Sequence, residues 1–226
     1  KIKEFKSAKC LRHLNLSHNQ LSFIPLWMEE LASLTKLFLD HNRFSESSFA
    51  CLSNDFGTKT CRRLQVLNLN NNELRALPPC LSNLKDAWNL NLGNVVTEEL
   101  KMKRGELSSV GNPWNYMIIA PDTIASMMGL GKLSLANLSL LEFPRWLHLL
   151  PRLEVLDLSG NRISYVNSDH ARSPSVKRLD LSRNHFVDCP KFGSNFPNLR
   201  ALILAENLID ELPLECLEGL KECHLD

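Results

Sequence analysis

Hydrophobic residues recur along this chain in the pattern L-x-x-L-x-L-x-x-N-x-L, where x stands for any residue. Leucine at every second position is typical of a short β-strand that buries one face. Most copies follow one another at intervals of 23 residues. Full copies start at Leu11, Leu34, Leu64, Ala87, Leu107, Leu130, Leu153, Val176 and Leu199, and a partial copy starts at Leu220. One copy cannot bury its leucines alone, so the pattern predicts a stacked array.

The strands of such an array are expected to form one parallel sheet. The predicted fold class is therefore an α/β solenoid shaped like a horseshoe or arc. The sheet would line its concave side, and short helices or irregular segments would form its convex side. An apolar residue followed by proline recurs late in several copies, which suits extended backbone that needs no ladder hydrogen bond. Segments 27–34 and 145–150 are the expected short helices.

Asparagine at the ninth position of the pattern is a second mark of the array. Its side-chain amide both donates and accepts, so stacked copies can satisfy the backbone where the chain turns inward off each strand. Val95 and Leu138 occupy the position in the two exceptions. The expected ladder consists of Asn19, Asn42, Asn72, Asn115, Asn161, Asn184 and Asn207.

Two regions interrupt the pattern within a single predicted domain spanning residues 1–226. The second copy is too long, and its surplus at 54–62 is expected to be a surface loop. Cys51 and Cys61 flank this loop and are either free thiols or a disulfide. The fourth and fifth copies are weak, which predicts an irregular joint over residues 87–129. Both ends fall within a copy, so we expect a fragment of a longer array or protein.

The segments LRHLNLSHNQLSFIPLWMEELASL and LEVLDLSGNRI resemble intracellular leucine-rich repeats, which are about 23 residues long. Such repeats occur in Ras-binding scaffolds, polarity scaffolds and Roco-type proteins. The resemblance covers essentially the whole chain and implies a leucine-rich-repeat solenoid. The stretch 111–129 is similar to the ending of Roco-type arrays, although here further copies follow it.

Composition narrows the class of partner. The 26 basic and 25 acidic side chains nearly balance, whereas a nucleic-acid binder usually carries a basic excess. No apolar run approaches the roughly 18 residues of a membrane span. The seven cysteines contain no CxxC and no zinc spacing. Reduced thiols and a cytoplasmic location are therefore expected.

The sequence shows no motif of a known active site, such as GxSxG, HExxH or a phosphate-binding loop, so we expect neither an enzyme nor a cofactor. His13, His18 and His41 are expected to lie near one another on the concave face of the first two copies. Either they form a metal site together with Asp40, or they belong to a solvated polar surface, which is the simpler interpretation.

Partner recognition is expected on the concave face, where side chains between the leucines project. Phe38 is the strongest candidate, because no core requirement explains an aromatic residue at an outward strand position. Trp88 and Trp114 either project there or turn into the core. Two acidic–basic pairs are expected on the later strands, Asp157 with Arg178 and Asp180 with Arg183. They either recognise a partner or are simple cross-strand pairs with each other. The full candidate set is His13, Asn15, Phe38, His41, Asn68, Trp88, Asn91, Trp114, Lys132, Asp157, Arg178, Asp180 and Arg183.

The sequence therefore predicts a protein–protein interaction module, such as the recognition or regulatory arm of an intracellular signalling or scaffold protein. One alternative is a secreted or cell-surface recognition domain of immune-receptor type. In that case the sequons at Asn15 and Asn137 could carry sugar. Another is the substrate-selecting arm of an enzyme whose catalytic domain lies outside this chain. We expect a protein partner, no nucleic acid, no membrane insertion, and further repeats or domains at both ends.

Overall fold

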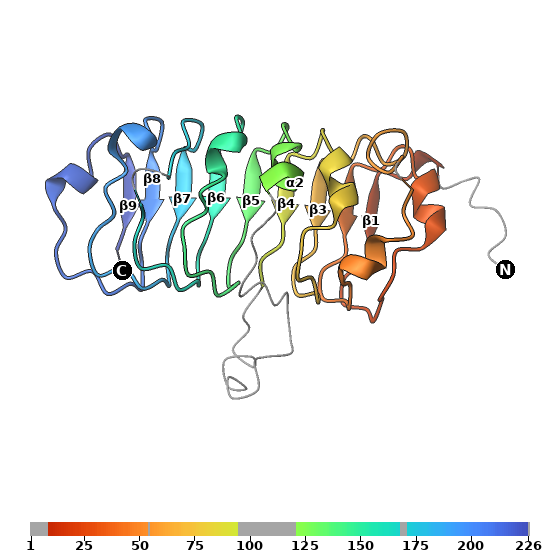
Figure 1. The fold of residues 1–226 in the computed structure, drawn as a ribbon, viewed down its shortest axis with the longest axis horizontal. Helices are drawn as coiled ribbons and strands as arrows, with labels where there is room; N and C mark the ends of the chain where they lie inside the picture. The colour runs from red at the N-terminus through yellow and green to blue at the C-terminus, as the bar shows by residue number, and fades with distance from the viewer. Residues whose placement is uncertain (1–8, 54, 95–120, 168–170, 226) are drawn as a thin grey trace.

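A computed structural model describes residues 9–53, 55–94, 121–167 and 171–225. Its described strands form one parallel sheet in the order of the chain, and Figure 1 shows them side by side along the long axis. They are β1 (His13–Asn15), β2 (Lys36–Phe38), β3 (Val66–Asn68), β4 (Asn89–Asn91), β5 (Lys132–Ser134), β6 (Val155–Asp157), β7 (Arg178–Asp180), β8 (Ala201–Ile203) and β9 (Glu222–His224). This arrangement confirms the predicted solenoid.

The segments between strands contain short helices, nearly all of them 3₁₀ turns. They are η2 (Leu26–Glu30), η3 (Glu46–Phe49), η4 (Pro79–Asn83), α2 (Pro121–Ala125), η5 (Leu147–Leu149), η6 (Gly193–Asn195) and η7 (Leu214–Cys216). Proline precedes or opens several of them, because its fixed φ suits the residue that enters a helical turn. No helix in the described ranges is long and apolar enough to cross a membrane.

Every strand presents its middle residue to the core. The middle leucines of neighbouring strands are paired in register, as in Leu37 with Leu67 and Leu67 with Leu90. All three are essentially inaccessible to solvent. Leucines from successive repeats form one continuous cluster from Ile24 to Cys216. Because burying each leucine contributes roughly 1.5–3 kcal/mol, the stacked core stabilises the array.

The asparagine ladder forms as predicted in the described repeats. The Asn72 amide donates to the carbonyl oxygens of Leu39, Leu69 and Asn70 at 3.1, 2.9 and 3.0 Å. Its Oδ1 accepts the N–H of Phe44 at 3.1 Å. Similar bonds are made by Asn42, Asn161, Asn184 and Asn207. Each amide thereby joins its own turn to the preceding repeat.

Two expectations about the irregular regions were wrong. The surplus in the second repeat is more than a surface loop, because Phe56 and Cys61 are buried in the core. The fifth copy predicted at Leu107 supplies no strand between β4 and β5, which pair directly from Asn89 with Lys132 onward. Leu107, Asn115 and the rest of 95–120 lie outside the described residues. Irregular spacing therefore does not interrupt the sheet.

Candidate functional site: the concave face

The first and third residues of each strand point away from the core, and we call the surface they form the concave face. A leucine follows the strand in most repeats, and the two residues after that leucine extend the concave face. The second of these two residues takes a left-handed backbone in most described repeats, because the chain turns sharply off the strand there. Positive φ values of 49–66° occur at His18, His41, Asn71, Asn137, Gly160, Arg183 and Glu206. Successive repeats thus align equivalent side chains in a row.

Phe38 lies half-buried on β2, between Asn15 of β1 and Asn68 of β3 in the sheet register. Neighbouring strands lie about 4.8 Å apart, so these three side chains form one continuous patch. The patch combines an apolar ring with two amides. His13, also predicted here, is exposed on β1.

Asp40 organises the polar groups beside this patch. Its Oδ1 accepts hydrogen bonds from Ser17 Oγ at 2.6 Å and from Asn68 Nδ2 at 2.9 Å. Its Oδ2 lies 4.0 Å from Nε2 of His18. One carboxylate therefore connects the first three repeats.

His18 and His41 occupy equivalent positions in the first two repeats and stack on each other. Their ring centroids are 4.1 Å apart, with 13° between the ring planes. His41 Nε2 lies 2.9 Å from Nδ2 of Asn71, which is the equivalent residue of the third repeat. Burial and the neighbouring His18 lower the pKa of His41, while Asp40 acts in the opposite direction. The net effect favours a neutral His41 ring at neutral pH.

Trp88 lies at the edge of the concave face rather than in the core, and 44% of it is exposed. The Lys132 ammonium sits 4.8 Å from the centre of its ring, within cation–π distance. A Cβ at Gly131 would come within 2.1 Å of the Trp88 Nε1, so only glycine lets the indole lie across the next repeat. Trp114, the other predicted anchor, lies outside the described residues.

The later strands carry charge, but the two arginines do not pair with the aspartates that the sequence suggested. Arg178 on β7 reaches Glu222 on β9 at 3.6 Å, past the small side chain of Ala201. Arg183 pairs with Glu206 at 2.8 Å.

The two predicted acidic partners accept hydrogen bonds from serines instead. Asp157 accepts hydrogen bonds from Ser134 and Ser159, and Asp180 accepts them from Ser182. Short serine contacts hold these carboxylates, which leaves each arginine to pair with a glutamate at the equivalent position of a later repeat.

A shallow hollow of about 280 Å³ lies in the middle of the concave face. Its lining includes the small residues Gly93, Ser134 and Ala136 and three predicted site residues, Asn91, Asp157 and Arg183. A Cβ at Gly93 would come within 2.7 Å of the Ala136 backbone nitrogen, so the close packing of these strands requires glycine. The hollow therefore brings together residues from the turn after β3, where Asn70 lies, to the turn after β7.

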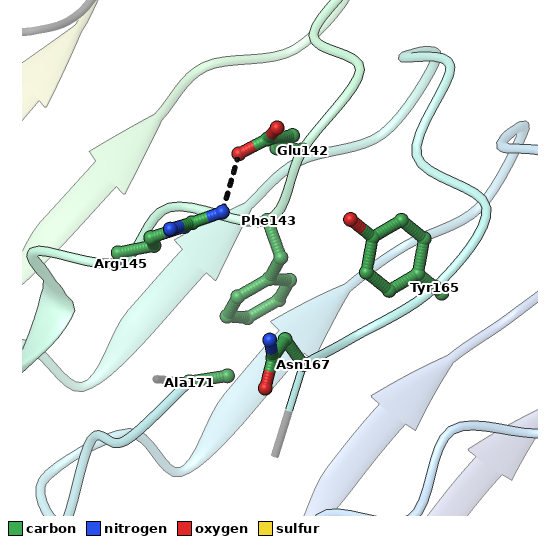
Figure 2. A pocket seen from close by; sticks show the side chains of 6 residues that line it. All are labelled: Glu142, Phe143, Arg145, Tyr165, Asn167 and Ala171. Carbon is green, nitrogen blue, oxygen red and sulfur yellow. Dashed lines mark hydrogen bonds and ion pairs between the residues drawn. The ribbon is translucent and has the colours of Figure 1, made fainter. Parts of the chain in front are cut away.

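A second hollow lies on the side of the solenoid and is lined by Glu142, Phe143, Arg145, Tyr165, Asn167 and Ala171. Figure 2 shows its side chains, with the Glu142–Arg145 ion pair of 3.1 Å at one edge. Its volume is about 10 Å³, which holds roughly one water molecule. It is too small for an organic ligand.

His18 was expected on the concave face beside His41 but was left out of the predicted partner-binding set, as were Glu206 and Glu222. All three sit at repeat positions equivalent to residues that were included. Comparing the same position across successive repeats, rather than judging each residue alone, would have found them.

Models of the leucine-rich repeat match residues 3–44, 63–84 and 152–172. Tsukushi from Mus musculus is 31% identical over 201 residues, which are 83% of this chain and 54% of that protein. The chain thus spans about half the length of this relative. Together with the repeating strands and asparagine ladder, these matches define the class of the molecule, a leucine-rich-repeat solenoid. The chain therefore has the fold of the leucine-rich-repeat proteins.

Solved structures agree over nearly the whole chain. The Leptospira interrogans protein LIC12759 superposes with a TM-score of 0.70 at 25% identity, covering 95% of this chain and 48% of that one. Toll-like receptor 13 in complex with ssRNA13 gives a TM-score of 0.69 at 26% identity, covering 97% and 29%. None of these three proteins is named as a Ras-binding, polarity or Roco-type scaffold, and one is a receptor. The matches therefore do not support the narrower expectation of a cytoplasmic scaffold.

Proposed function

We propose that this chain is a recognition module that binds a protein partner on its concave face, with Phe38 as the main apolar anchor. The position of Phe38 carries the proposal. It is an outward residue at the middle of a patch of amides, and aromatic residues beside adaptable polar groups make effective interface anchors.

The patch is also held rigid, which reduces the entropy lost on binding. Asn68 donates to Asp40, and Asp40 is bonded in turn to Ser17. The backbone beneath is fixed by the buried Asn42 and Asn72 amides. A partner would therefore meet a surface whose side chains are already ordered.

The charges of the concave face favour a protein over a nucleic acid. Lys132, Arg178 and Arg183 are offset on this surface by acidic groups at Asp157, Asp180, Glu206 and Glu222. A phosphate backbone would meet both signs, whereas a protein surface can present complementary charges. We therefore do not propose RNA, which is bound in the Toll-like receptor 13 complex, as the ligand of this chain.

Quantitative affinity capture after cross-linking tests the proposal. The chain and a Phe38→Ala, Arg178→Ala double variant are compared in an extract of the native source, with Leu214→Ala as a matched control. Leu214 is 82% exposed on η7, away from the concave face. We expect the double variant to capture at least tenfold less partner than the parent chain, and the control to capture the same amount as the parent. Equal capture by all three proteins would refute the role of the concave face.

A second candidate is recognition outside the cell, favoured by the similarity to a Toll-like receptor across 97% of this chain. Asn15 is exposed and offers its amide within a sequon. The amide of Asn137, by contrast, donates to the Asn94 carbonyl at 2.7 Å. Intact mass of the native protein before and after glycosidase treatment separates the two settings. A mass decrease that an Asn15→Gln variant does not show supports the extracellular setting, and an unchanged mass of the native protein supports the intracellular one.

A further inference from the structure

Three metal-ligating side chains meet at one edge of the concave face. His18, Asp40 and His41 each offer a ligand atom, and these atoms lie within 4.8 Å of one another. Sheet stacking causes the meeting, because His18 and His41 follow equivalent strands and share a left-handed backbone with φ of 55° and 54°. Asp40 directly precedes His41 and points toward His18. Residues 23 apart in the sequence thus form one local cluster.

We propose that His18, Asp40 and His41 bind a divalent transition-metal ion of the zinc type, through two imidazole nitrogens and one carboxylate oxygen. Two nitrogens and one oxygen suit zinc, nickel or copper. Calcium and magnesium prefer sets of six or more oxygens, which this cluster does not offer. Three protein ligands leave at least one coordination position for water or for a partner's side chain.

The carboxylate is already oriented for this role. Ser17 and Asn68 both donate to Oδ1 of Asp40, at 2.6 and 2.9 Å. The other oxygen, Oδ2, is the one that faces His18 at 4.0 Å. Hydrogen bonds of this kind fix a metal ligand's direction and are a regular feature of metal sites.

Asn71 can orient the second imidazole in the same way. Its amide lies 2.9 Å from Nε2 of His41. Turning the amide places Oδ1 there as an acceptor for an Nε2–H, which leaves Nδ1 with its lone pair toward a metal.

Besides the turn of the Asn71 amide, metal binding requires one imidazole ring to move. Zinc lies in the plane of each imidazole about 2.0–2.1 Å from the nitrogen, so two ligand nitrogens in a tetrahedral site are about 3.3 Å apart. The two stacked rings are nearly parallel, so one ring must turn toward the other. His18 can turn, because 72% of its side chain is exposed and little packing opposes rotation. The backbone can stay in place.

Calorimetric titration with zinc chloride tests the site in tag-free protein. Exposed thiols are first alkylated, since Cys10 and Cys51 could bind zinc themselves. The variants are His18→Ala and His41→Ala, and the matched control is His13→Ala, an exposed histidine of β1 outside the cluster. Circular dichroism checks that each variant folds, and the exposed His18 is the decisive position.

We expect the parent to bind one zinc ion and both cluster variants to bind at least tenfold more weakly, with the control unchanged. Side-chain nitrogen NMR signals of His18 and His41 should move on adding zinc, while that of His13 stays. Three results would overturn the proposal: no saturable binding by the parent, unchanged affinity in His18→Ala, or an equal loss in His13→Ala.

Discussion

Replacing Asn72 by alanine removes a buried amide that makes four hydrogen-bond contacts, two within its own repeat and two with the preceding repeat. Three go to carbonyl oxygens and one comes from the Phe44 N–H. Asn72 is 1% exposed, so water cannot readily replace the lost partners. An asparagine amide has two N–H donors, so two of the three carbonyl contacts share one hydrogen. At about 1 kcal/mol for each of the two donors and the one acceptor, we expect the free energy of unfolding to fall by about 3 kcal/mol.

Asn19 provides a matched control at the same position of the first repeat. Its amide donates to Leu16 and Ser17, but the residue is exposed and water can substitute. Asn19→Ala should therefore cost less than about 1 kcal/mol. A third variant, Asn72→Asp, retains an acceptor but directs a carboxylate at three carbonyl oxygens. It should destabilise at least as much as alanine near neutral pH.

Urea unfolding followed by far-UV circular dichroism measures all three variants, with the midpoint compared at constant slope. The reasoning depends on burial and not on the asparagine pattern itself. If Asn72→Ala and Asn19→Ala lost the same amount, or if Asn72→Ala lost under about 1 kcal/mol, the ladder would not be a main source of stability.

Two further substitutions and one comparison of thiol reactivity test individual features. Gly131→Ala should displace the Trp88 ring and shift tryptophan emission, because the new Cβ would lie 2.1 Å from the indole nitrogen; the shift should vanish in a Trp88→Phe background. Burial raises the pKa of the Cys61 thiol to about 12, so at pH 8 it should react with a disulfide reagent far more slowly than the exposed Cys51, and equal rates would contradict this. Gly160→Ala should lose roughly 2 kcal/mol in urea unfolding, since φ is +66° and a side-chain oxygen of the preceding repeat occupies the Cβ position.

The repeat pattern predicted the sheet well because each strand depends on local periodicity and on its nearest neighbours. Leu37, Leu67 and Leu90 are paired and buried as the alternation requires. Spacing alone could not predict that β4 and β5 pair directly with each other. A weak match to the pattern carries no information about whether the strands on either side pair directly, as β4 and β5 do.

Side-chain partners on the concave face were harder to predict, because long side chains choose among several neighbours at similar distance. Arg178 could reach Asp157 on β6 or Glu222 on β9, and the small Ala201 between strands decides for Glu222. Phe56 was missed for a related reason. An insertion has no repeat position, so its burial depends on tertiary packing that periodicity does not describe.

The weakest part of the pattern turns out to be joined by different contacts. Val95 and Leu138 lack the ladder asparagine, yet the residue before each is an asparagine. Asn94 Nδ2 donates to the Asn137 carbonyl at 3.1 Å, and Asn137 Nδ2 donates to the Asn94 carbonyl at 2.7 Å. This reciprocal pair connects the repeats of β4 and β5, and Trp88 with Lys132 spans the same junction on the strand side. The junction is therefore bonded at both edges of the concave face. For this reason the aromatic, amide-lined part and the charged part can act as one continuous surface toward a partner.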